Sequence, residues 1–198
     1  MIVKSLKKIK NNYEVNLDDN KFIFDEEIII KYRLVEKKEI SDSLIDEIIH
    51  NNNLVLYYKK ALNYALKYNK NSASIVDYLT KFELKNSEIK EIIDQLIKIK
   101  VIDDKKLILN DLYSLINKGN GKLMIINKLY KLKFNDELID YAINNIDYEL
   151  YYNALKKQYN KAKEKYKDES DDYIKDIKIK RYLYNKGYSL DDIRSLDE

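Results

Sequence analysis

The chain has 198 residues, of which 45% are hydrophobic, so it can form one domain or two small ones. It contains no Cys, which excludes disulfides, thiolate zinc sites and a cysteine nucleophile. The 37 basic and 34 acidic side chains nearly balance, for a net charge of +3. No apolar run approaches the roughly 20 residues that span a bilayer, and lysines interrupt the N-terminal apolar stretches. We therefore expect a cytoplasmic protein without a signal peptide or membrane contact.

The N-terminal segment has the alternating pattern of strands. Apolar and polar residues alternate in residues 13–17 and again in residues 21–24, with the turn residues Asp18, Asp19 and Asn20 between them. This predicts a β-hairpin. Further along, Asp25 and Ser41 are positioned to cap short helices that end near Arg33 and Asn52.

From residue 54 onward, five apolar positions recur three times with spacings of 4, 5, 5 and 3 residues, and the copies are offset by 50 and 54 residues. Each copy fits two helices, and a longer amphipathic helix precedes each pair. A single unit of this kind cannot bury its own apolar stripe, so successive units must stack against one another. The positions are Ile75, Leu79, Leu84, Ile89 and Ile92; Ile125, Leu129, Phe134, Ile139 and Ala142; and Ile179, Leu183, Tyr188, Ile193 and Leu196.

The sequence thus predicts a mainly α protein in which three tandem three-helix repeats form an elongated, curved array. A small N-terminal region of β-hairpin and short helices precedes them. The expected boundaries are residues 1–53 for this region and residues 54–103, 104–146 and 147–198 for the three repeats. Gly119, Gly121 and Gly187 fall at expected helix breaks.

No residues have the spacing of a catalytic or metal site. His50 is the single histidine and lacks partners at a fixed spacing. Paired aspartates at 18–19, 103–104, 171–172 and 191–192 lie at turns or helix starts, where capping explains them. Three glycines are too few for a phosphate-binding loop. We expect no enzymatic activity, no cofactor and no metal, and we expect a monomer.

Placement of charge is more informative than its total. Residues 51–133 hold 16 basic and 8 acidic side chains, whereas both flanking segments are slightly acidic. In the helix after Gly121, the 3.6-residue period places Ile125, Leu129 and Leu132 on the core side and Lys128 and Lys131 beside it. An acidic or polyanionic partner would suit this segment. A merely solvated surface is the alternative.

The residues expected to bind such a partner come from all three repeats. Lys81 occupies in the first repeat the position of Lys131 in the second, so stacked repeats would align Lys81, Lys128 and Lys131 in a basic strip with Lys122 near its end. Lys180, Arg181 and Lys186 in the third repeat are the next candidates. The basic run 156–167 is interpreted as the solvent-exposed side of a helix. The buried seam of the same helix, meaning its row of core residues, is expected to consist of Tyr152, Leu155, Tyr159, Ala162 and Tyr166.

Several motifs together resemble the RecX family of regulatory proteins. Residues 99–104 (IKVIDD) are similar to the junction between the first and second repeats of that family. Residues 118–121 (KGNG), followed by the Ile-x3-Leu pattern of the second repeat, are similar to its second-repeat signature. Residues 179–183 (IKRYL) and 186–188 (KGY) match the end of its third repeat. The resemblance covers nearly the whole chain. The chain departs from the family at Asn71, Ile126 and Lys133, where Arg, a basic residue and Gly are usual.

The resemblance implies a non-enzymatic modulator that binds along the RecA–DNA filament and inhibits RecA ATPase and strand exchange in recombinational DNA repair. It implies RecA as the main partner, with weaker binding to single- or double-stranded DNA. A helical repeat protein that binds nucleic acid without RecA is the alternative, and it would bind DNA alone with a steep salt dependence.

Overall fold

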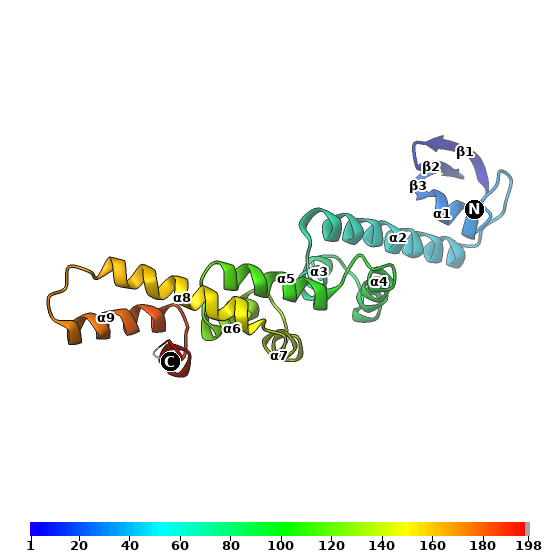
Figure 1. The fold of residues 1–198 in the computed structure, drawn as a ribbon. Helices are drawn as coiled ribbons and strands as arrows, with labels where there is room; N and C mark the ends of the chain where they lie inside the picture. The colour runs from blue at the N-terminus through cyan, green and yellow to red at the C-terminus, as the bar shows by residue number, and fades with distance from the viewer. Residues whose placement is uncertain (197–198) are drawn as a thin grey trace. The chain divides into compact units, whose positions relative to one another are not determined.

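The computed structural model describes residues 1–196, and within this range three strands precede ten helices (Figure 1). The chain is therefore mainly α with a small N-terminal β element, as predicted. It divides into two compact units: Met1–Lys70 with Ile75–Val101, and Asn71–Ser74 with Ile102–Glu198. Residues 197–198, at the end of the expected repeat 147–198, lie outside the described residues. No helix in the described part is long and apolar enough to cross a membrane.

The first unit begins with an antiparallel sheet in the order β1-β2-β3, formed by Val3–Ile9, Asn12–Leu17 and Asn20–Asp25. The β2–β3 hairpin confirms the prediction. Strand β1 was not predicted, because only Val3 is buried in it and a register shift between Val3 and Ser5 interrupts the alternation of buried and exposed positions. The inner face of the sheet packs on the short helix α1 (Glu26–Lys31), which Asp25 caps as expected.

Helix α2 (Asp42–Tyr68) runs without a break through residues 51–54, so the helix end expected near Asn52 is wrong. Ser41 caps this helix as predicted, and its hydroxyl accepts from the Leu44 N–H. Asn52 stays in the helix because its side chain is buried and bonded to β3. Its Oδ1 accepts the Asp25 N–H at 2.8 Å, and its Nδ2 donates to the Ile23 carbonyl at 3.3 Å. These tertiary bonds outweigh the local tendency of asparagine to end helices.

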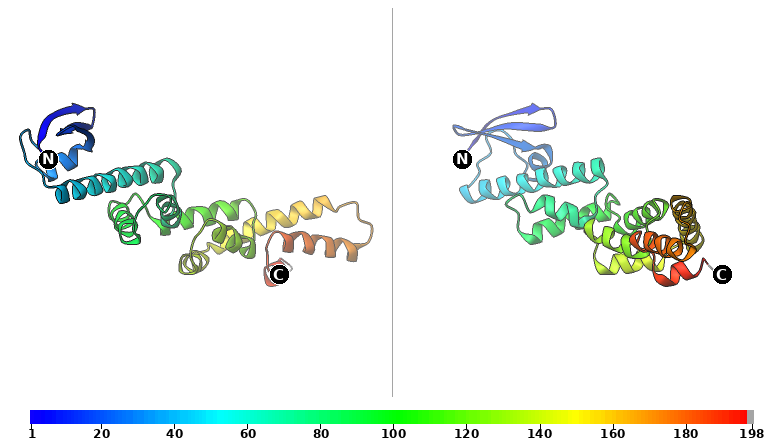
Figure 2. Two further views of the ribbon diagram at one scale, coloured as in Figure 1. Left: turned by 180° about the vertical axis from the view of Figure 1, so that it is seen from behind. Right: turned by 90° about the vertical axis from the view of Figure 1, so that its left-hand side faces the viewer.

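A buried carboxylate anchors α2 to the sheet. Asp25 is 3% exposed, and its Oδ2 accepts a 2.6 Å hydrogen bond from the Lys59 ammonium group. The sheet and α1 lie on one side of α2, and α4 lies on the other side (Figures 1 and 2). The remaining helices of the first unit are α3 (Ser72–Leu79), whose first residues belong to the second unit, and α4 (Asn86–Lys98).

The second unit is a single hydrophobic core enclosed by six helices. Helix α5 packs against α6, α7 and α8, while α8 and α9 run side by side in opposite directions (Figure 1). Asp103, Asn135, Asp147, Asp171 and Ser189 cap their helices through side-chain oxygens. The helices are α5 (Asp104–Asn117), α6 (Lys122–Lys131), α7 (Asp136–Asn144), α8 (Tyr148–Lys165), α9 (Asp172–Asn185) and α10 (Leu190–Arg194).

The apolar positions of the sequence repeat form the interior, as expected. All are buried except Leu84 and Leu196, which are half-buried. Leu132 is the exception among residues assigned to the core side of α6, because it is 45% exposed. The helix ends at Lys131, and Lys133 then adopts a left-handed conformation with φ of 67°. The helical period therefore no longer applies at Leu132.

The seam expected along α8 is shifted by one residue at its start. Tyr151 is buried and Tyr152 is 37% exposed. Leu155 and Ala162 are buried as predicted, whereas Tyr159 and Tyr166 are half-buried. Gln158 is also buried, and its Oε1 accepts from the Tyr182 hydroxyl at 3.2 Å. The sequence pattern did not predict that Gln158 is buried, because a search for periodic apolar residues passes over polar side chains.

We predict that Leu129→Asp unfolds α5–α10 together, because Leu129 is fully buried in the core that these helices share. An unpaired buried carboxylate costs several kcal/mol, comparable to the stability of a whole domain. Helicity followed by circular dichroism during urea unfolding measures the loss. Leu132→Asp is the control and should leave the unfolding midpoint nearly unchanged. Equal midpoints for the two variants would contradict this assignment of the core.

Candidate partner-binding surface

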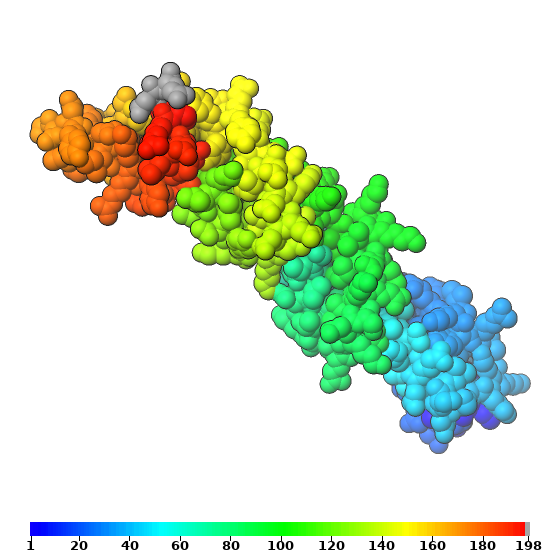
Figure 3. All heavy atoms as spheres, turned by 90° about the horizontal axis from the view of Figure 1, so that it is seen from below, coloured from blue at the N-terminus to red at the C-terminus, as the bar shows by residue number. Residues whose placement is uncertain are grey.

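Two chain reversals of the second unit meet backbone to backbone, and we call this contact the glycine junction. The Gly121 N–H donates to the Lys186 carbonyl at 2.8 Å, and the Leu123 N–H donates to the Gly187 carbonyl at 3.0 Å. A Cβ added at Gly121 would lie 2.2 Å from the Tyr188 nitrogen, so no larger residue fits there. The space-filling view shows the red C-terminal segment against the light-green segment that contains α6 (Figure 3).

Tyr151 completes the junction. Its hydroxyl accepts the Lys122 N–H at 2.9 Å and donates to the Asp192 carboxylate at 3.0 Å. Together with the Gly187 carbonyl, it satisfies the first two N–H groups of α6, so these two donors are not available to an outside anion. Burial, assisted by the nearby Asp192 charge, raises the pKa of the Tyr151 hydroxyl well above its usual range.

We predict that Tyr151→Phe destabilises the second unit by about 1–3 kcal/mol, because the partly buried Lys122 N–H loses its partner and Asp192 loses a donor. Tyr152→Phe, at the adjacent exposed position, is the control and should have little effect. The raised pKa means that the buried neutral hydroxyl stabilises the fold below about pH 10 and that this contribution is lost as pH rises further. Chemical unfolding at several pH values should therefore show the difference between Tyr151→Phe and wild type shrinking above about pH 10. A difference that stays constant would contradict the buried, neutral state.

The expected basic strip divides between the two units. Lys81 lies in the first unit, just after α3, whereas Lys122, Lys128 and Lys131 lie on α6 in the second. On α6 the helical period places Lys122 and Lys128 on opposite sides of the buried stripe, while Lys131 points away from it. Lys81, Lys122 and Lys131 are exposed.

Lys128 is only half exposed because it holds a buried side chain. Its Nζ donates to the Asn120 Oδ1 at 2.7 Å, and Asn120 Nδ2 donates to the Leu115 carbonyl at the end of α5. Asn120 is 7% exposed, so the ammonium group satisfies an otherwise buried acceptor. Lys128 therefore has a structural task, which the sequence pattern did not indicate.

The third-repeat candidates lie at and near α9. Lys186 is the C-cap residue of this helix, its carbonyl is part of the glycine junction, and its ammonium group lies 5.6 Å from the centre of the Tyr182 ring. Lys180 and Arg181 are exposed, and Lys180 forms a 2.7 Å ion pair with Asp176 one turn earlier.

Sequence reasoning missed three exposed apolar side chains beside Lys180 and Arg181. Tyr173, Ile177 and Tyr184 are 75%, 46% and 57% exposed. Their spacing of four and seven residues places them on one side of α9, turned away from the buried Ile179 and Leu183. This spacing was visible in the sequence, but the apolar residues on both sides of the helix made it ambiguous which side is buried. We call Tyr173, Ile177, Lys180, Arg181 and Tyr184 the α9 outer face.

The groups considered for catalysis or metal binding have structural partners. Asp103 and Asp171 cap helices, and Asp104 accepts from the Ser72 N–H at 2.9 Å. His50 Nε2 lies 2.9 Å from Glu88 Oε1, which joins α2 to α4. Within residues 1–196, no cluster of three or more His, Cys, Asp or Glu residues could hold a metal ion.

Comparisons with known proteins converge on one family. The family model described as RecX, third three-helix domain, matches residues 149–196. Regulatory protein RecX of Leuconostoc mesenteroides is 30% identical, over 94% of this chain and 70% of its own length. The protein of the same name from Streptococcus uberis is 27% identical, over the whole chain and 76% of its own length.

Solved structures give the same result for the fold. A crystal structure of regulatory protein RecX covers the whole chain with a TM-score of 0.81 at 23% identity, and 99% of that chain is matched. The crystal structure of RecX from Lactobacillus salivarius covers 73% of the chain with a TM-score of 0.67 at 26% identity, and 94% of that chain is matched.

Proposed function

The chain belongs to the RecX family of regulatory proteins, and from this we propose that it binds the RecA–DNA filament and inhibits RecA's ATPase and strand-exchange activities. The observation that carries the proposal is the similarity of almost the entire chain to proteins named as RecX regulators. A regulator of this kind acts by binding, so it requires exposed surfaces that suit a protein–DNA filament rather than a catalytic constellation.

The α9 outer face supports protein binding. Tyrosine and arginine are enriched at the centres of protein interfaces, where their large side chains bury apolar area and form hydrogen bonds. Tyr173 and Tyr184 expose their rings on this face, and Arg181 stands between them along the helix. We propose that this face contacts RecA.

The exposed lysines support an electrostatic contribution. Lys81, Lys122 and Lys131 have no ion-pair partner among the described residues, so they are available to acidic protein patches or to phosphates. Charges at the edge of an interface mainly increase the rate of association. We keep Lys128, Lys180 and Lys186 in the proposed binding set only as secondary members, because each has a contact within the protein.

The alternative function is nucleic-acid binding that does not involve RecA. Titration of the protein into a RecA ATPase assay on single-stranded DNA separates the two. The proposed function predicts inhibition at protein concentrations too low to coat the DNA. Inhibition that appears only when the DNA is saturated would favour the alternative.

We predict that Tyr173→Ala combined with Tyr184→Ala raises the half-inhibitory concentration in this assay about tenfold or more, because tyrosine is enriched among the interface residues whose truncation costs about 2 kcal/mol or more. Both rings are solvent-exposed, so the thermal midpoint should stay near that of wild type. Tyr148→Ala is the control, because Tyr148 is 73% exposed on α8. A folded double variant that inhibits like wild type would remove the α9 outer face from the interface.

We also predict that reversing three unpaired charges, with Lys81→Glu, Lys122→Glu and Lys131→Glu, weakens inhibition about tenfold at low salt and less at high salt. Lys128 stays unchanged in this variant because it supports Asn120. The control reverses Lys90, Lys98 and Lys100 to Glu, which changes the net charge equally on and beside α4. Equal losses for the two triple variants would mean that net charge, rather than position, governs binding.

A further inference from the structure

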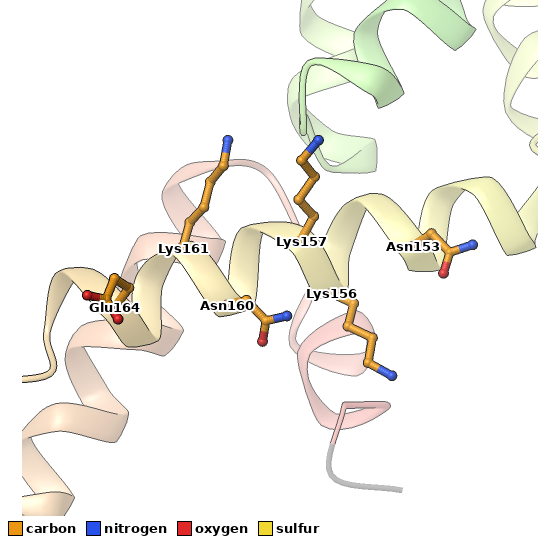
Figure 4. Close-up of a pocket in the computed structure, with 6 residues that line it drawn as sticks. All are labelled: Asn153, Lys156, Lys157, Asn160, Lys161 and Glu164. Atoms are coloured by element: carbon orange, nitrogen blue, oxygen red, sulfur yellow. The ribbon is translucent and has the colours of Figure 1, made fainter.

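The outward side of α8 carries an unusual set of side chains. Five exposed residues, Asn153, Lys156, Lys157, Asn160 and Lys161, follow one another over two turns, and we call them the α8 lysine face. Lys157 and Lys161 extend to one side of the helix and Lys156 to the other, with Asn160 between them (Figure 4). Every member carries an N–H donor, and none is apolar or acidic.

These lysines lack the partners that neighbouring lysines have. Lys167 is paired with Glu164 at 2.7 Å, and Lys163 and Lys165 lie over tyrosine rings. Among the described residues, Lys156, Lys157 and Lys161 have no ion pair and no ring contact. The nearest acidic residue on the same side, Glu164, is the one already paired with Lys167.

This arrangement does not help the helix itself. Lys157 and Lys161 are one turn apart, and like charges at this spacing destabilise a helix by a few tenths of a kcal/mol. The helix dipole favours lysines in the last turn, but Lys156 and Lys157 lie in the middle of α8. Carboxylates are abundant nearby in the sequence, at Asp168, Glu169, Asp171 and Asp172, yet none is on this face.

The composition of the face distinguishes between classes of partner. Interface centres in protein complexes are depleted in lysine and enriched in aromatic residues, so a face of lysine and asparagine is a poor protein-docking site. Single-stranded nucleic acids are held on aromatic stacking platforms, and this face has no ring. Duplex DNA offers two rows of phosphates on either side of a groove that admits a helix, and ammonium groups suit phosphates as point charges.

We propose that the α8 lysine face binds the phosphates of duplex DNA, with Lys157 and Lys161 on one flank of the helix and Lys156 on the other. This proposal rests on the proposed function, which makes DNA the expected polyanion, and it adds the surface of the protein that binds the DNA. The α9 outer face remains the surface for protein. The binding assay contains no RecA, so each proposal can fail while the other stands.

The test measures binding of the full chain to a labelled duplex oligonucleotide over a range of salt concentrations. The variant Lys156→Gln, Lys157→Gln and Lys161→Gln should bind about tenfold more weakly at low salt, and its slope of log Kd against log salt should fall by about 2 to 3. The triple Lys→Arg variant at the same positions should retain binding. The thermal midpoint of the Gln variant should not fall, because the three side chains are exposed and have no ion pair or ring contact among the described residues.

The matched control changes Lys90, Lys98 and Lys100 to Gln, with the same loss of charge on and beside α4, where Glu91 and Asp94 lie among the lysines. The control should bind duplex DNA like wild type. Equal losses for both triple variants, or none for the α8 variant, would overturn the proposal.

Three competing polyanions complete the test. A single-stranded oligonucleotide of the same sequence, poly-glutamate, and phosphatidylglycerol vesicles should each compete with the duplex less well than unlabelled duplex does. Stronger competition by any of them would assign the face to a single strand, an acidic protein or a lipid surface instead, and would overturn the duplex assignment. If the α8 variant loses DNA binding but still inhibits RecA as well as wild type, the DNA-binding face stands and inhibition proceeds through another surface.

Discussion

The second unit depends on a close backbone contact between two chain reversals. Gly121 and Gly187 bring the segment after α5 and the segment after α9 close enough for N–H groups of one to bond carbonyls of the other. Gly187 also adopts a φ of 89°, which favours glycine strongly over other residues. Hydrogen bonds between neighbouring backbones fix both distance and direction, and the helices on either side of this contact share one hydrophobic core. The hydroxyl of Tyr151 extends the same contact to α8 and α10.

This junction also determines which basic residues are available to a partner. Lys128 is used to satisfy Asn120, directly beside Gly119 and Gly121, and Lys186 contributes its carbonyl and covers the Tyr182 ring. A sequence pattern that lists basic residues by repeat position treats these two as equivalent to Lys131, although their surroundings differ. Exposed positive charge without an internal partner lies elsewhere, for example at Lys131 and on the α8 lysine face.

Local rules predicted much of this fold because local physics decides it. Capping by Asp25, Ser41 and Asn135 depends on a side chain and its own helix start, and the apolar repeat depends on the helical period. What was missed depends on contacts between segments far apart in the sequence. Asn52 remains helical because β3 bonds its side chain, and Tyr151 is buried rather than Tyr152 because Asp192 and the start of α6 supply its hydrogen bonds.

The candidate surfaces were harder to predict, because exposure depends on which side of a helix its neighbours cover. Helix α9 carries apolar residues on two sides, and the sequence alone does not say that Ile179 and Leu183 enter the core while Tyr173 and Tyr184 stay outside. The basic run 156–167 was correctly predicted to be solvent-exposed. Which of its lysines have partners could be determined only from the positions of Glu164, Tyr159 and Tyr166 in the structure.

The α8–α9 pair suggests how one small protein can meet two kinds of partner. The two helices pack side by side and bury residues in the same core, and each keeps one side exposed. One exposed side offers aromatic rings and a guanidinium group, which suit a desolvated protein contact, and the other offers only ammonium and amide donors, which suit hydrated phosphates. A filament of protein on DNA presents both chemistries at neighbouring points along one axis. Placing the two faces on two different helices lets each face bind by its own physics, since lysines crowded around the rings would oppose the desolvation that the protein contact needs.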